Sequence, residues 1–204
     1  MTDKHPLLQI RDLNCAVARW PALTLVEGDC VTVAGPSGSG KTRLLRAVAD
    51  LDANDGDVRL HGRPRETFPG HRWRRRVVYL PAESGWWAET VGEHFAAVDD
   101  GLLAELGFDA DVTGWSVDRL STGERSRLAL ARAAAVRPLV LLLDEPTANL
   151  DTGTTERVEA VVARLRQGGL GVIWVTHDPA QVARLGARRF GIQHGEAREV
   201  RNDP

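Results

Sequence analysis

A glycine-rich stretch near the N-terminus carries the residues best suited to chemistry. It reads GPSGSGKT and fits the pattern G-x-x-x-x-G-K-[ST], between an apolar run and a helical pattern. Glycines let backbone N–H groups turn toward phosphate oxygens, and the positive end of the following helix points at the same anion. We expect Lys41 to reach the β- and γ-phosphates of a nucleotide and the Thr42 hydroxyl to bind Mg²⁺. The residues predicted to contact the nucleotide here are Gly35, Pro36, Ser37, Gly38, Ser39, Gly40, Lys41, Thr42 and Arg43.

An acidic pair follows the most apolar run of the chain. Leu139–Leu143 leads directly into Asp144 and Glu145. A carboxylate at the end of a buried strand beside a phosphate loop can hold Mg²⁺, which suits Asp144. Glu145 points elsewhere and is suited to polarise an attacking water as general base. The alternative is an ordinary acidic turn after a strand, and the phosphate loop favours the catalytic interpretation.

A histidine ends another apolar run. His177 follows Ile173–Thr176, where its imidazole is placed to contact a γ-phosphate and to orient Glu145. A single histidine at a strand end is often merely structural. Because it follows a core strand of the same predicted sheet, we predict that His177 and Glu145 are the catalytic residues.

A capping box opens a long helical pattern in the second half of the chain. Ser121 and Glu124 have the spacing at which each side chain bonds the other's backbone N–H. The structural interpretation is a helix start and nothing more. The functional one is phosphate binding by the Ser121 hydroxyl, the Gly123 N–H and the helix dipole. This second group of predicted nucleotide contacts is Ser121, Thr122, Gly123 and Glu124.

Continuous apolar runs alternate with helical patterns, which indicates an α/β fold with a parallel sheet covered by helices. The predicted strands are Cys30–Ala34, Val77–Leu80, Leu139–Leu143 and Val172–Val175. The predicted helices are Thr42–Leu51, Val91–Val98, Ser121–Val136 and Thr155–Arg166.

Two regions depart from this alternation. The N-terminal part has strand patterns at Leu7–Leu13, Leu23–Leu25 and Asp57–His61, with Asp55-Gly56 as a hairpin-type signal. We expect a small antiparallel sheet there, beside the parallel core. Residues 83–137 are mainly helical and irregular, and we interpret them as a subdomain inserted into one domain that spans residues 1–204.

Composition sets limits on location and partners. The chain has 204 residues, 43% hydrophobic and 26% charged, with a net charge of −2, so nothing indicates a nucleic-acid binder. No apolar run approaches the ~18 residues of a membrane-spanning helix, and residues 1–6 lack the apolar stretch of a signal peptide. We therefore expect a soluble cytoplasmic chain that meets a membrane only through a partner.

Taken together, these motifs resemble the ATP-binding cassette family over roughly Leu7 to Val200. The parts that match are GPSGSGKT, LSTGE in place of the signature LSGGQ, LVLLLDEP, TANLD and WVTHD, in the family's order. The signature between the two nucleotide motifs separates this family from other phosphate-loop ATPases. The resemblance implies a P-loop NTPase fold with an N-terminal antiparallel β-subdomain and an inserted helical subdomain.

The resemblance also implies a mechanism. Two copies of such a subunit sandwich two ATP molecules head to tail, each between one phosphate loop and the other copy's signature, with Asp151 crossing the interface. ATP and Mg²⁺ are the implied cofactors, hydrolysis to ADP and phosphate the reaction, and a transmembrane permease the implied partner. The implied location is the cytoplasmic face of the cell membrane.

The chain departs from the family pattern at three places. Ala82 stands where a Mg²⁺-binding glutamine usually lies, with Glu83 as an adjacent substitute. The residues expected to stack on adenine, Cys15–Val17, include no aromatic, which leaves Trp20 as the nearest candidate. Thr122 replaces a signature glycine.

Alternatives remain for one patch and for the overall function. Trp86-Trp87 are interpreted either as a patch that receives the permease or as packing within the helical subdomain. The competing functions are a soluble cassette ATPase of translation or DNA repair, which would carry a second cassette or long insertions, and a nucleotide-binding regulator without turnover.

Overall fold

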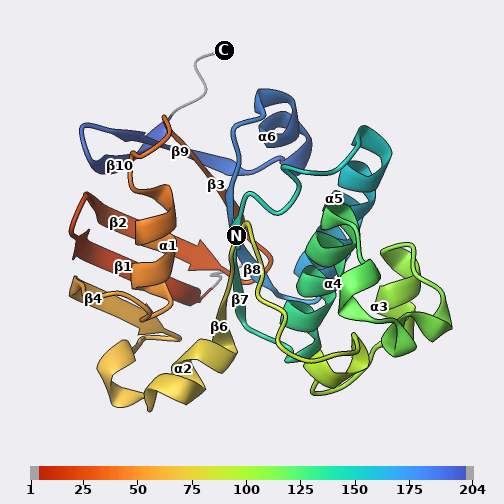
Figure 1. The fold of residues 1–204 in the computed structure, drawn as a ribbon. Coiled ribbons are helices and arrows are strands. Elements are labelled where there is room, and N and C mark those ends of the chain that lie inside the picture. Colours follow the sequence, from red (N-terminus) through yellow and green to blue (C-terminus); the bar gives the residue numbers. More distant parts are fainter. Residues whose placement is uncertain (1–4, 201–204) are drawn as a thin grey trace.

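One ten-stranded mixed sheet runs through residues 5–200, the part of the chain that the computed structural model describes (Figure 1). Its strand order is β5-β4-β1-β2-β10-β9-β3-β8-β7-β6. The α/β class predicted from the sequence is confirmed. Residues 1–4, which hold most of the segment tested for a signal peptide, lie outside the described residues. The strands are β1 Pro6–Cys15, β2 Ala18–Val26, β3 Cys30–Ala34, β4 Asp55–Leu60, β5 Arg63–Pro64, β6 Val77–Leu80, β7 Val140–Asp144, β8 Gly171–Val175, β9 Arg188–Gln193 and β10 Glu196–Val200.

Six α-helices are described in this part of the chain. They are α1 Lys41–Val48, α2 Gly70–Arg76, α3 Asp100–Glu105, α4 Thr122–Ala135, α5 Thr152–Gln167 and α6 Pro179–Leu185. Residues 83–137 contain α3, α4 and three short 3₁₀ turns, Gly92–His94, Ala110–Gly114 and Val117–Arg119. None of the helices within residues 5–200 has both the length and the hydropathy needed to cross a bilayer.

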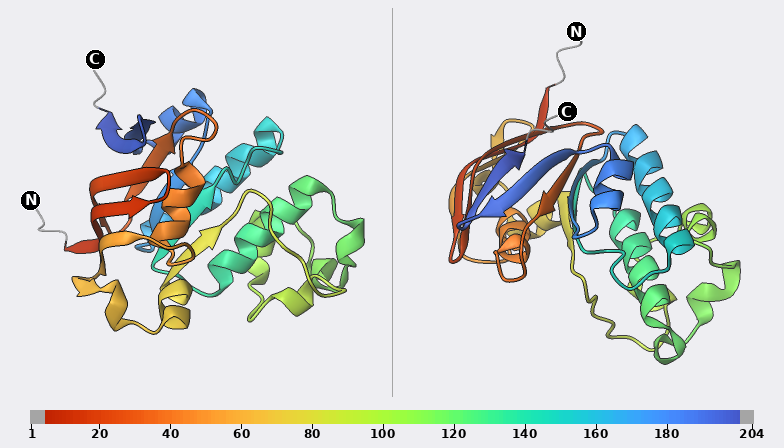
Figure 2. Two further views of the ribbon diagram at one scale, coloured as in Figure 1. Left: turned by 60° about the vertical axis from the view of Figure 1, so that its left-hand side comes forward. Right: turned by 90° about the horizontal axis from the view of Figure 1, so that it is seen from above.

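The parallel strands are buried on both faces, which explains their continuous apolar sequences. Along β7, Val140 and Leu142 pack toward α1, whereas Leu141 and Leu143 pack toward α4 and α5. Figure 2 shows α1 between the antiparallel strands and the parallel strands, with α4 and α5 on the opposite side. The sheet therefore fixes α1, and with it the phosphate loop, against the ends of β3 and β7.

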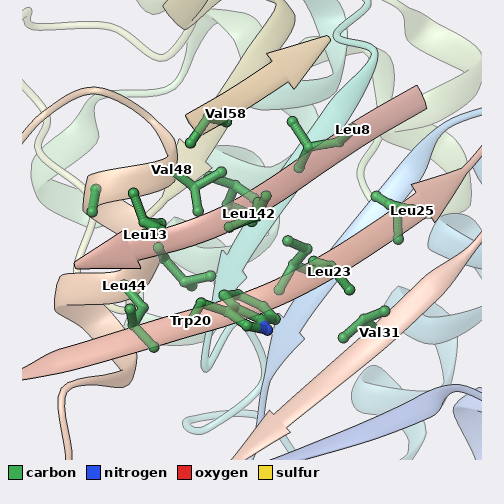
Figure 3. Close-up of a cluster of buried hydrophobic side chains, with 14 of the residues drawn as sticks. Leu8, Leu13, Trp20, Leu23, Leu25, Val31, Leu44, Val48, Val58 and Leu142 are labelled. Carbon is green, nitrogen blue, oxygen red and sulfur yellow. The ribbon is translucent and has the colours of Figure 1, made fainter. Parts of the chain in front are cut away.

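The antiparallel strands close the core around α1. Leu8, Leu13 and Leu23 from β1 and β2 meet Leu44 and Val48 of α1 (Figure 3). These strands join the same sheet as the parallel core, because β10 pairs with both β2 and β9. The expected antiparallel pairing of the N-terminal strands is confirmed, and these strands are continuous with the parallel core in one sheet. The C-terminal hairpin β9–β10, which the sequence patterns did not indicate, supplies the connection.

Two local predictions were wrong. Asp55-Gly56 is not a hairpin turn but part of β4, opposite a bulge in β1 where the register shifts between Arg11 and Asn14. Gly56 has φ 119°, and a Cβ there would lie 2.4 Å from the Asp12 carbonyl oxygen. The bulge therefore requires glycine at this position.

The predicted helix Val91–Val98 is also absent. Only Gly92–His94 forms a 3₁₀ turn, because neighbouring backbone groups pair elsewhere. The Val91 N–H donates to the Trp115 carbonyl, and the Val117 N–H donates to the Glu89 carbonyl. This segment is thus held to residues 115–117 instead of coiling on itself.

Candidate functional site

The glycine-rich loop, residues 35–40, connects β3 to α1 without regular structure. Gly38 has φ 75° and Gly40 has φ 98°, a left-handed conformation that side chains disfavour. Gly40 also lies against the β1–β2 turn, since a Cβ on it would be 2.6 Å from the Ala18 Cβ. The loop is therefore shaped by glycines at the positions that the motif requires.

Lys41 is the first residue of α1, and its side chain lies against the loop. It is 7% exposed, and its Nζ donates to the Gly35 and Pro36 carbonyl oxygens, both at 2.9 Å. Burial lowers the pKa of the Lys41 ammonium, while the carboxylates of Glu145 and Asp144 raise it. Two backbone carbonyl oxygens of the loop thus hold the ammonium group at the cleft, where an anion would bind.

The first turn of α1 adds further donors. No side chain caps this helix, so its N-terminal N–H groups remain available to an anion. The Ser39 Oγ is buried and has no partner among the described residues. Such an orphaned buried hydroxyl fits a ligand oxygen.

Asp144 gathers two hydroxyl groups at the end of β7. The Thr42 Oγ1 donates to its Oδ2 at 2.7 Å, and the Tyr79 hydroxyl donates to the same oxygen at 2.9 Å. Asp144 is 4% exposed. The Thr42 hydroxyl and the Asp144 carboxylate are hard oxygen donors of the kind that Mg²⁺ prefers, so these residues fit the cation.

Glu145 and His177 form the second polar pair. The Glu145 backbone is left-handed, with φ 50°, and its N–H donates to the Val175 carbonyl, so β8 holds this unusual conformation. The His177 Nε2 lies 2.6 Å from the Glu145 Oε1. The pair is thereby aimed at the loop and does not continue the strand.

A cleft of about 360 Å³ lies at the carboxyl ends of the parallel strands. The structure thus brings the phosphate loop, Glu145 and His177 to one cleft, and Asp144, which does not line it, is hydrogen-bonded to Thr42, which does. The lining residues are Val17, Ser37, Gly38, Gly40, Lys41, Thr42, Arg43, Glu145 and His177.

The signature residues are not part of this cleft. Ser121 caps α4: its backbone N–H donates to the Glu124 Oε2 at 2.8 Å, and the Glu124 N–H donates to the Ser121 Oγ at 3.3 Å, which forms the predicted capping box. The Ser121 hydroxyl also donates to the Glu124 Oε2, at 2.8 Å. Ser121 and Glu124 line no part of the cleft, nor do Thr122 and Gly123 between them. Within a single chain, the second group of predicted nucleotide contacts lies away from the first.

Trp20 cannot stack on adenine. It is 0% exposed and packs edge-on against Phe190, with ring centroids 5.4 Å apart. Alternation along β2 turns its side chain into the core. The residue that takes the expected place beside the loop is Val17, in the β1–β2 turn, which is 54% exposed.

The two adjacent tryptophans divide between the two interpretations. Trp86 packs against the apolar cluster of the helical region, whereas Trp87 is 74% exposed. Both rings meet His94 edge-on, and the Arg132 guanidinium lies over both. The His94 Nε2 accepts the N–H groups of Trp87 and Ala88, which fixes this loop.

A groove of about 310 Å³ runs along this cluster and the edge strand β6. Arg132 is half-buried in it and makes no ion pair among the described residues. The residues that line the groove include Arg74, Tyr79, Trp87, His94 and Arg132.

One residue of the site was missed by the sequence analysis. Tyr79 is the last residue but one of β6, so strand alternation could have placed it on the face that carries Asp144. Val17, by contrast, belongs to the segment Cys15–Val17 that was expected beside the adenine.

The fold and the cleft define a class, the phosphate-loop ATPases. The ABC transporter family model matches residues 21–148. The chain is 39% identical to the phosphate import ATP-binding protein PstB of Mycobacterium intracellulare, over 92% of this chain and 76% of that protein. It is 37% identical to an aliphatic sulfonates import ATP-binding protein, SsuB 3, of Paraburkholderia xenovorans, over 85% of this chain and 69% of that protein. The chain belongs to the ABC transporter family, and its activity is ATP hydrolysis that powers transport across a membrane.

Solved structures agree on the fold. A dimeric, post-hydrolysis structure of the ATP-binding cassette MJ0796 with ADP and Pi matches with a TM-score of 0.78 and 23% identity, over 97% of this chain and 99% of that one. An ATP-bound bacterial Atm1-family exporter matches with a TM-score of 0.82 and 19% identity, over 97% of this chain and 38% of that one.

Proposed function

We propose that two copies of this chain close head to tail over two ATP molecules, and that hydrolysis reopens them to drive a membrane subunit. The observation that carries the proposal is the separation of the two nucleotide-binding groups. Residues of the phosphate loop, Glu145 and His177 line one cleft, with Asp144 hydrogen-bonded to Thr42 beside it, whereas Ser121–Glu124 lie outside it. A second copy supplies the missing half when its α4 N-terminus faces this cleft.

The triphosphate would replace hydrogen bonds that the Lys41 side chain makes to backbone carbonyl oxygens of the loop. The Lys41 Nζ exchanges the Gly35 and Pro36 carbonyl oxygens for β- and γ-phosphate oxygens. The uncapped N–H groups of α1 point their partial positive charge at the same anion. Ser37 and Arg43 line the cleft, and the buried Ser39 hydroxyl is available to a phosphate oxygen.

Thr42 and Asp144 are the residues that would hold Mg²⁺. The Thr42 Oγ1 and the Asp144 Oδ2 lie 2.7 Å apart at the carboxyl end of β7. Mg²⁺ is octahedral and keeps waters and phosphate oxygens beside one or two protein ligands, so a pair of donors is sufficient. When bound, the cation neutralises charge on the phosphate oxygens.

Glu145 acts as the general base. The His177 Nε2 donates to the Glu145 Oε1, which leaves Oε2 free to accept a proton from the attacking water. The water oxygen bonds to the γ-phosphorus, the bond from that phosphorus to the bridging oxygen breaks, and ADP leaves. The products are ADP, phosphate and the proton held on Glu145.

The partner copy contributes its signature. The Ser121 hydroxyl and the Gly123 N–H lie at the positive end of α4, where a γ-phosphate would be stabilised. In the isolated chain the Ser121 hydroxyl is occupied by Glu124. Asp151, which caps α5 through the Thr154 N–H, would lie at the same interface.

We place the membrane subunit at the groove beside β6. Trp87 offers exposed aromatic area, and Arg132 offers a charge that is half-buried and unpaired among the described residues. Aromatic residues and arginine are typical of interface cores. This arrangement would hold the chain at the cytoplasmic face of the membrane. The substrate is chosen by that subunit.

The test uses Glu145→Gln, which removes the base while keeping the shape. With ATP and Mg²⁺, we expect the variant to elute as a dimer in size-exclusion chromatography and the ATPase rate to fall by about 10²–10⁴-fold, the contribution of a general base. The wild-type rate per molecule should rise with protein concentration, because the dimer is the active form. Glu66→Gln, an exposed change outside the cleft, is the matched control. An unchanged ATPase rate in Glu145→Gln would refute the assignment of the base.

A further inference from the structure

The position where the family carries a glutamine has no side chain able to replace it. Ala82 is exposed and ends in a methyl group. Glu83 is also exposed and makes neither a hydrogen bond nor an ion pair within residues 5–200. Neither residue lines the cleft of the phosphate loop. Neither Ala82 nor Glu83 therefore makes a polar link between this segment and the catalytic strand.

Tyr79 makes such a link, three residues earlier. In the parallel pairing of β6 and β7 it lies opposite Leu142, so its side chain shares a sheet face with Leu142 and with Asp144 two residues further. The phenol hydroxyl spans this diagonal and donates to the Asp144 Oδ2 at 2.9 Å.

Tyr79 also belongs to the groove on the other side of β6. With Leu80 and Pro81 it contributes to the groove that Trp87 and Arg132 line. Strand β6 is the edge of the sheet and pairs only with β7 among the described strands. A partner protein bound in the groove would contact β6. The Tyr79 side chain extends from β6 to the Asp144 carboxylate.

We propose that Tyr79 is a positioning residue that connects the groove to the Mg²⁺-binding carboxylate of Asp144, in place of the glutamine that Ala82 lacks. The inference rests on the proposed function, since it assumes that Asp144 holds the cation. The hydroxyl groups of Thr42 and Tyr79 both donate to the Asp144 Oδ2 and so fix the plane of the carboxylate. The direction of the other oxygen, Oδ1, is fixed with it. Outer-shell bonds of this kind set the affinity of a site for its metal.

The test is Tyr79→Phe, which removes one hydroxyl and keeps the ring. Free Mn²⁺ is followed by electron paramagnetic resonance during titration of the full chain with a non-hydrolysable ATP analogue. We expect Mn²⁺ affinity to fall about tenfold, the effect of losing an outer-shell partner. Binding of the same analogue in EDTA, and the thermal denaturation midpoint without nucleotide, should not change.

Two further arms make the result decisive. Adding Ala82→Gln to Tyr79→Phe should recover Mn²⁺ affinity, and failure to recover would overturn the replacement of the glutamine. Equal Mn²⁺ affinity in wild type and Tyr79→Phe would overturn the inference alone. So would an equal loss with and without metal, because that is the mark of a purely structural role. Wild-type protein that binds no Mn²⁺ with the analogue would refute the proposed function itself.

Discussion

The seating of the phosphate loop against the β1–β2 turn can be tested with two alanine substitutions. Gly38 and Gly40 have the same sign of φ, 75° and 98°, and lie two residues apart in one loop. A Cβ on Gly38 would meet nothing within 4 Å, whereas a Cβ on Gly40 would lie 2.6 Å from the Ala18 Cβ and 3.1 Å from the Val17 Cγ2. The pair therefore separates backbone cost from steric cost.

The magnitudes follow from these two terms. A left-handed conformation costs an ordinary side chain about 1–2 kcal/mol, which both variants lose. Gly40→Ala adds overpacking, about 1–3 kcal/mol, because the Ala18 Cβ is fixed to the backbone of β2 and cannot turn away. We expect Gly40→Ala to lose more stability than Gly38→Ala by that second amount. For a chain of this size the difference corresponds to about 2–4 °C in Tm for each kcal/mol.

The assay is urea denaturation of both variants without nucleotide, followed by tryptophan fluorescence. Equal losses of unfolding free energy would mean that the loop does not rest on the β1–β2 turn and would refute the reasoning. Gly40→Ala together with Ala18→Gly is the matched control. Removing the Ala18 Cβ should recover the steric part of the loss and leave the backbone part.

Two more predictions concern the base site and the pH dependence of stability. Val17→Tyr should tighten ATP binding about fivefold, because base stacking on an aromatic ring contributes about 1 kcal/mol or more. Val17→Leu, the control, should not change the affinity. Competition with a fluorescent nucleotide measures both affinities, and equal values for the two variants would contradict the prediction. Hydrogen bonds from Arg46, with Arg43, lower the pKa of Asp52 to about 2 from its usual 3.8, so this carboxylate stabilises the fold above pH 3.8 and ceases to do so as pH falls through about 2. Asp52→Asn should therefore cost about 1 kcal/mol at pH 7, the upper end for a surface ion pair, and progressively less as pH falls through about 2, where the carboxylate of the folded protein is half protonated. A loss in urea denaturation that is independent of pH would argue against the pair.

The composition of the cleft could be predicted because strand ends determine it. Lys41 follows β3, Asp144 ends β7 and His177 follows β8, and these are neighbouring parallel strands. Carboxyl ends of parallel strands meet at one edge of the sheet, so motifs far apart in sequence meet in space. Continuous apolar runs identified these strands to within a residue at most ends.

Where prediction failed, the deciding contacts were distant in sequence. Whether Trp20 faces the core or the cleft depends on the register of β2 against β1, which the apolar pattern of Leu23–Leu25 did not fix. The helix predicted at Val91–Val98 lost to backbone bonds with residues 115–117. The C-terminal hairpin β9–β10 has short, partly exposed strands whose pairing with β2 and β3 cannot be inferred from local periodicity.

The departures from the family pattern fall on one side of the chemistry. Lys41, Asp144, Glu145 and His177, which would act on the phosphates and the water, are all present. Lys41, Glu145 and His177 line one cleft, and Asp144 is hydrogen-bonded to Thr42 of the same cleft. The changes lie at the base site and at the loop after β6. Loss of an adenine-stacking ring weakens selection of the nucleotide, because phosphate contacts are the same for every triphosphate. Loss of the glutamine at Ala82 removes a link to the partner groove without removing the general base. We therefore expect hydrolysis to proceed by the family's route, while its control by the membrane subunit depends on β6 and Tyr79.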